Sequence, residues 1–180
     1  MNFTDGLEQY LDGIPSLNGR YESVLSRSIE CERKLDGFIH GPPIEHKRIQ
    51  WIIYTHLIIN GYNAEVERKY NNGSLDVYAW GCSSSGLWLP EKGWGIEVSE
   101  SPPHKGDMRS KAEHYASQVG KFSLAFLCNS KRRDSYLLSR VLGKVREAEH
   151  ELQQYTDGCH IHSLLLIDKE LSIPLIEMVI

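Results

Sequence analysis

The chain lacks the long apolar runs and the paired cysteines that mark several large classes of protein. No apolar run approaches the roughly 20 residues that span a bilayer, and the start, MNFTDGLEQY, has no basic or apolar segment of a secretion signal. The four cysteines (Cys31, Cys82, Cys128 and Cys159) form no C-x-x-C pair. This argues against a zinc ribbon and gives no sign of a disulfide framework. We therefore expect an intracellular protein, cytoplasmic or nuclear, with no membrane partner.

Excess positive charge is also missing. The 180 residues carry 20 lysines and arginines against 24 acidic residues, a net charge of −4, so no overall positive field draws the protein to nucleic acid. A local basic candidate is the run KRR at 131–133, although such a short run is more often a solvated loop.

Glycines, prolines and apolar periodicity predict an alternation of helices and strands in one domain. Two helices in the first forty residues each end at a glycine, and a long helix runs from Pro42 and Pro43 to Gly61. Strands are expected at 64–70, 74–80, 93–101, 122–128, 162–168 and 171–180, with further helices at 107–119 and 134–155. The order predicts an α/β sandwich with a mixed central sheet flanked by helices. We divide it into a helical N-terminal extension (1–41), a core (42–128), and a C-terminal helix and strands (129–180).

Two carboxylates stand out on the second and third expected strands. Alternation places Asp76 with Tyr78 and Trp80 on one face of SLDVYAW, opposite Leu75 and Val77, and it places Glu97 with Ser99 on one face of GIEVSES. If the strands are neighbours, Asp76 and Glu97 lie side by side, where mutual repulsion and burial would raise their pKa. A divalent cation, most naturally Mg²⁺, relieves both problems. The alternative is the wet face of an antiparallel pair, against which the neighbouring aromatic residues weigh.

A third carboxylate, Glu45, lies one turn before Ile49 on the apolar stripe of the long helix, and we expect it to face the core. It is either a further acid of the site or a charge that complements the helix dipole. The spacing leaves both interpretations open.

The helix after Glu97 carries Lys111 within its apolar stripe, with Asp107 expected as N-cap. An i,i+4 ion pair between Asp107 and Lys111, worth about 0.3–0.5 kcal/mol, would explain the spacing. It would not explain why the pair is placed against the sheet.

These motifs together resemble the PD-(D/E)XK nuclease superfamily. LDV followed by IEVS is similar to its Asp…Glu-x-Lys strand pair, and Asp107, Lys111 and Tyr115 match the D-x3-K-x3-Y helix of a restriction-endonuclease-like branch. The start PPIEHKRIQ resembles the first helix of that branch, with Glu45 at its acidic position. The resemblance covers roughly residues 42 to 128. Two positions depart from the superfamily pattern: Ser99 stands at its lysine and Leu75 at its proline.

The resemblance implies a restriction-endonuclease-like three-layer sandwich and a Mg²⁺-dependent (or Mn²⁺-dependent) endonuclease that hydrolyses phosphodiester bonds in DNA. Asp76, Glu97 and the carbonyl of Val98 would hold the metal. Lys111 would replace the strand lysine, and Glu45 would join the catalytic set. Cutting both strands of a duplex would favour a homodimer. The alternative is a catalytically inactive nuclease-fold protein that binds nucleic acid or a protein partner.

Overall fold

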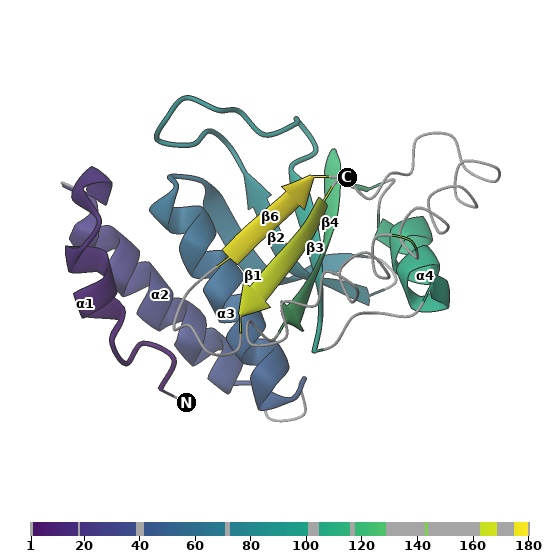
Figure 1. Ribbon diagram of the computed structural model, residues 1–180, viewed down its shortest axis with the longest axis horizontal. Helices are drawn as coiled ribbons and strands as arrows, with labels where there is room; N and C mark the ends of the chain where they lie inside the picture. Colours follow the sequence, from purple (N-terminus) through teal and green to yellow (C-terminus); the bar gives the residue numbers. More distant parts are fainter. Residues whose placement is uncertain are drawn as a thin grey trace.

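Six strands form one mixed sheet, and they lie in the sheet in the same order as in the chain. The protein is described here from a computed structural model, which describes residues 2–17, 19–38, 42–70, 73–100, 105–115, 118–128, 143, 163–168 and 175–179. Figure 1 shows the sheet between the N-terminal helices α1 and α2 on one side and α4 on the other. The expected class, α/β with a mixed sheet and flanking helices, is confirmed.

The N-terminal elements are α1 (Leu7–Asp12), the 3-10 turn η1 (Pro15–Leu17), α2 (Tyr21–Asp36) and α3 (Ile44–Ile59). As the sequence predicts, Gly13 and Gly37 follow the first two helices directly. Gly61, just after α3, has φ of 94°, and a Cβ there would lie 2.5 Å from the backbone nitrogen of Ser84. Glycine is therefore required at the turn that leads from α3 into the sheet.

The strands follow as β1 (Asn63–Tyr70), β2 (Gly73–Trp80), β3 (Trp94–Ser99), β4 (Lys121–Cys128), β5 (Ser163–Asp168) and β6 (Leu175–Val179). The first three are antiparallel, β3, β4 and β5 are parallel, and β6 is antiparallel to β5. Helix α4 (Lys105–Tyr115) provides the crossover that a parallel β3–β4 pair needs.

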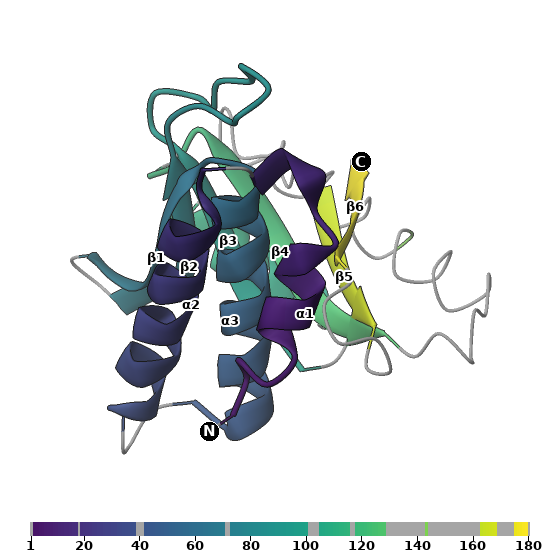
Figure 2. The same cartoon turned by 90° about the vertical axis from the view of Figure 1, so that its left-hand side faces the viewer.

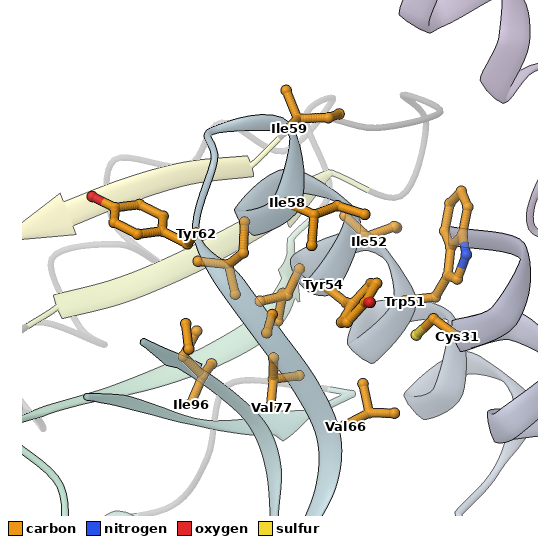
Figure 3. Packing of buried hydrophobic residues seen from close by; sticks show 14 of the residues in the cluster. Cys31, Trp51, Ile52, Tyr54, Ile58, Ile59, Tyr62, Val66, Val77 and Ile96 are labelled. Atoms are coloured by element: carbon orange, nitrogen blue, oxygen red, sulfur yellow. The ribbon is translucent and has the colours of Figure 1, made fainter. Parts of the chain in front are cut away.

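The core lies between the sheet and α3, with α1 and α2 packed outside α3 (Figure 2). Figure 3 shows Ile52 and Ile58 of α3 above Val77 and Ile96 of the sheet, and Trp51 on the other side of the helix, next to Cys31 of α2. The indole of Trp51 donates a hydrogen bond of 2.9 Å to the carbonyl of Ser28 in α2. The N-terminal helices therefore share one core with the sheet.

The start of α4 differs from the expectation, and two further expectations fall outside the described residues. The helix expected from Asp107 begins at Lys105, so Asp107 lies inside its first turn and is not the N-cap. The helix expected at 134–155 and the basic run at 131–133 lie outside the described residues. No helix in the described part of the chain is long and apolar enough to cross a membrane.

Candidate functional site

Strands β2 and β3 meet at two buried carboxylates. Val77 pairs with Ile96, so the next antiparallel step brings Asp76 opposite Glu97. There the side chains accept backbone hydrogen bonds across the pair: the Asp76 N–H donates to Glu97 Oε1 at 3.3 Å, and the Val98 N–H donates to Asp76 Oδ2 at 2.7 Å. Asp76 is 9% exposed and Glu97 6%. The expected juxtaposition is confirmed, and the alternative of a wet face is excluded.

Helix α3 holds the other oxygen of Asp76. The ring Nε2 of His46 lies 2.9 Å from Asp76 Oδ1, and the amide Nε2 of Gln50 donates to the same oxygen at 3.0 Å. Both contacts come from a helix that packs against β1, β2 and β3. Because His46 and Gln50 are four residues apart, they lie on one side of α3.

The expectation that Asp76 shares a face with Tyr78 and Trp80, and Leu75 a face with Val77, is wrong. Asp76 reaches α3, whereas Leu75 lies close to Gly95 and Val119. The alternation of β2 is broken at this point, across from an irregular residue of the neighbouring strand β1.

Glu67 of β1 stands across from Asp76 with φ of 54°, a left-handed conformation that is uncommon for a residue other than glycine. Its carboxylate accepts hydrogen bonds from Gln50 Nε2 at 2.7 Å and from Ser74 Oγ at 2.8 Å. Gln50 thus joins the carboxylates of Glu67 and Asp76. Backbone strain of this kind gathers at functional sites, where surrounding contacts maintain it.

Gln50 is fully buried, and among the described residues its side-chain oxygen has no hydrogen-bond partner. An unpaired buried oxygen is costly. Its position beside Asp76 therefore adds to the signs that this cluster is adapted for a purpose other than stability.

Lys111 closes the cluster from α4, and as expected it is directed at the sheet. Its ammonium lies 2.9 Å from Glu97 Oε2 and donates to the Val98 carbonyl at 3.2 Å. The predicted alternative partner was Asp107, but the structure places the ammonium on Glu97. One turn later, the hydroxyl of Tyr115 donates to the Ser74 carbonyl at 2.9 Å.

Burial and the charges within the cluster together raise the pKa of three of its side chains. Burial, and then the charge of Asp76, raise the pKa of Glu97 to about 7, against the opposing effect of Lys111. Burial and the charges of Glu97 and Asp76 raise the pKa of Tyr115 to about 12. Burial disfavours the imidazolium of His46, but the hydrogen bond and charge of Asp76 raise its pKa overall.

Glu45 lies apart from this cluster. Its side chain is 51% exposed and sits 3.5 Å from Arg48. The expectation that it faces the core is wrong, because α3 is buried on all sides from Ile49 to Thr55. An apolar stripe on such a helix does not define one direction, so extrapolating it one turn back is uninformative.

Sequence reasoning missed His46, Gln50 and Glu67. The i,i+4 spacing of His46 and Gln50 next to Glu45 was a usable signal for the first two. Nothing local marks Glu67, because its left-handed backbone depends on tertiary contacts.

The donors suit a hard cation, although they are few. Asp76, Glu97 and the Val98 carbonyl offer oxygen atoms at one place, and a cation, the Lys111 ammonium, already contacts two of these three residues. Within the part of the chain that the structure describes, no three His, Cys, Asp or Glu side chains form a group that could hold a metal ion. A metal here would therefore rest on two carboxylates and a carbonyl, an arrangement that Mg²⁺ completes with water.

Comparison of the chain with protein-family models, with curated proteins and with solved structures finds no match.

Proposed function

We propose that the protein is a metal-dependent nuclease that hydrolyses phosphodiester bonds in DNA, with Asp76, Glu97 and Lys111 as its catalytic residues. The observation that carries the proposal is the buried Asp76–Glu97 pair with the Lys111 ammonium 2.9 Å from Glu97. The order of these residues, on two adjacent strands and the following helix, is the one that the resemblance to PD-(D/E)XK nucleases implies.

Charge balance supports a cation at this place. Asp76 and Glu97 carry two negative charges when ionised, against one positive charge from Lys111. Burial first, and then the charge of Asp76, raise the pKa of Glu97, and a bound cation would oppose both effects. Asp76, Glu97 and the Val98 carbonyl would hold Mg²⁺ or Mn²⁺. A bound ion of this kind polarises a phosphate and makes water a better nucleophile.

The protein's own residues would position the Asp76 carboxylate and neutralise negative charge on the phosphate. His46 and Gln50 hold Asp76 Oδ1, so that this carboxylate is fixed before any substrate arrives. Lys111 is a flexible ammonium beside the place where negative charge would develop on a phosphate, and it would stabilise that charge. Glu45, exposed beside Arg48, is given no part in this proposal.

The test is incubation with supercoiled plasmid in Mg²⁺, in Mn²⁺ and in a chelator. We predict that the wild type nicks or linearises the plasmid only with metal, and that Asp76→Ala and Glu97→Ala each abolish cleavage while circular dichroism shows a folded protein. Glu91→Gln removes an exposed loop carboxylate and serves as the matched control. Cleavage by either alanine variant would remove that residue from the site.

A calorimetric Mg²⁺ titration separates the nuclease from the alternative, an inactive nuclease-fold protein. Binding that requires Asp76 and Glu97 supports the nuclease. A folded wild type that neither binds Mg²⁺ nor cleaves the plasmid would favour the inactive alternative.

A further inference from the structure

A row of stacked side chains runs along β1 and β2 and reaches α4. Trp80 stacks on Tyr78 with ring centroids 5.6 Å apart and an interplanar angle of 25°. The guanidinium of Arg68 lies 3.9 Å from the Tyr78 centroid and 5.7 Å from that of Tyr70. The ring of Tyr70 is 6.2 Å from that of Tyr115. We call these five residues the stacking row.

The row presents flat groups to solvent. Trp80 is 38% exposed and the Arg68 side chain 38%, whereas Tyr78 is 7% exposed and supports both from below. Glu65 lies 3.1 Å from the Arg68 guanidinium, which fixes the plane of the guanidinium and offsets its charge. Trp80 and the Arg68 guanidinium, both held against the ring of Tyr78, together form an extended flat platform.

The row ends at the carboxylate cluster. Tyr115 bonds to the Ser74 carbonyl, and Ser74 bonds to Glu67. Tyr115 is one helical turn from Lys111, whose ammonium lies on Glu97. A ligand stretched along the row would therefore arrive at the proposed catalytic residues.

The chemistry of the row selects the ligand. Aromatic faces and guanidinium planes stack with unpaired bases, a contact that tolerates any sequence because every base has a π-face. A duplex hides its base faces and is bound through its phosphates by clustered lysines and arginines. Here the chain has a net charge of −4, and the one cation of the row is paired with Glu65.

We propose that the stacking row binds the unpaired bases of single-stranded nucleic acid and leads the strand to Asp76 and Glu97. The inference names the substrate class of the proposed nuclease, and in that respect it rests on the proposed function.

The test measures binding without cleavage, by fluorescence anisotropy in a chelator. The probes are labelled oligothymidylate, labelled oligouridylate of the same length, and a labelled duplex. We expect either single strand to bind more tightly than the duplex, and the comparison of the two single strands shows which sugar the surface accepts. Tighter binding of the duplex overturns the proposal. So does a wild type that binds none of the probes, a result that would favour a protein partner for the stacking row.

The decisive variants are substitutions of two tryptophans, Trp80 within the row and Trp88 outside it. Trp80→Ala should weaken single-strand binding by about 5- to 150-fold, the range for loss of one base-stacking partner. Trp80→Phe keeps a ring and should retain most of the affinity, which guards against a folding defect. Trp88→Ala removes a still more exposed tryptophan, 75% accessible and outside the row, and should leave binding unchanged. Equal losses in Trp80→Ala and Trp88→Ala would contradict the assignment.

The two proposals can fail separately. Single-strand binding that depends on Trp80, with no cleavage of any substrate in metal, would retain the row and overturn the nuclease. In the opposite case, Trp80→Ala would cleave both single strands and duplex with metal at the wild-type rate. That result would retain the nuclease proposal and overturn the role of the stacking row.

Discussion

Glu97 is buried between a second carboxylate and an ammonium, and its ionisation links the chemistry of the site to the stability of the protein. Its pKa is about 7 when folded, against a reference value of 4.5. Between these pH values the folded state holds a proton that the unfolded state has released. The stability that Glu97 contributes is therefore present below pH 4.5 and is lost as the pH rises through 7.

We predict that the melting temperature falls between pH 5 and pH 8, by the equivalent of up to about 3 kcal/mol from Glu97. Mg²⁺ should restore much of this loss at pH 8 and have little effect at pH 5, because it would bind the ionised carboxylate. The measurement is thermal unfolding across this pH range, with and without Mg²⁺.

Glu97→Gln is the control for this experiment, since it removes the titrating group and should flatten the pH dependence. The control also separates Glu97 from His46, whose raised pKa acts in the same direction because its contribution too is lost as the pH rises. An unchanged slope in Glu97→Gln would show that Glu97 does not titrate in this range.

At the scale of elements, the site depends on a distorted strand. Glu67 has φ of 54° in β1, opposite Asp76, and Gln50 and Ser74 hold its carboxylate. We predict that Glu67→Val destabilises the protein by roughly 1–3 kcal/mol more than Glu67→Gly, because a β-branched side chain opposes the left-handed backbone that glycine accepts. Urea unfolding measures the difference. Equal stability of the two variants would mean that β1 relaxes to a regular strand.

A second element, α4, delivers the lysine that a PD-(D/E)XK strand would carry at Ser99. We predict that Lys111→Ala lowers cleavage by about 100-fold or more and leaves Mg²⁺ binding in place. Lysine would stabilise charge without ligating the ion. Adding Ser99→Lys to Lys111→Ala should restore part of the rate, since a long flexible stem can bring an ammonium to the same point from β3.

Plasmid cleavage and calorimetry measure these two effects of Lys111. Lys121→Ala, at the start of β4, is the matched control and should be mild. Full activity of Lys111→Ala would reduce this lysine to a structural partner of Glu97.

At the scale of the whole molecule, the N-terminal helices are part of the single core that carries the site. Leu7, Leu11, Val24, Cys31 and Leu35 of α1 and α2 are buried in the same cluster as α3 and the sheet. Burying five such side chains stabilises the fold by roughly 10 kcal/mol, which is comparable to the entire stability of a typical domain.

We predict that deleting residues 1–37 gives a chain that aggregates or stays unfolded. The expected readouts are loss of cooperative thermal unfolding in circular dichroism and elution in the void volume of a sizing column. A truncated chain that still melts cooperatively would show that residues 42–128 and the following strands fold without the two helices.

The sequence alone determined the α/β class, the mixed sheet and three residues of the cluster. Asp76, Glu97 and Lys111 could be singled out because charged residues within a strand pattern and within the apolar stripe of a helix are visible locally, although the direction of the Asp76 side chain did not follow the period-2 pattern. Glu45 could not be placed, because a helix buried on all sides has no periodic face from which to extrapolate.

Only the tertiary structure decided which side chains meet at Asp76. His46 and Gln50 come from a helix 26 to 30 residues away in sequence. Glu67 joins them through a left-handed backbone conformation that a glutamate does not favour by itself. The direction of the Lys111 ammonium was likewise settled in three dimensions, where buried Glu97 attracted it more strongly than exposed Asp107. The physical reason is common to all of these: propensity and periodicity act between near neighbours in the chain, whereas burial and charge act between neighbours in space.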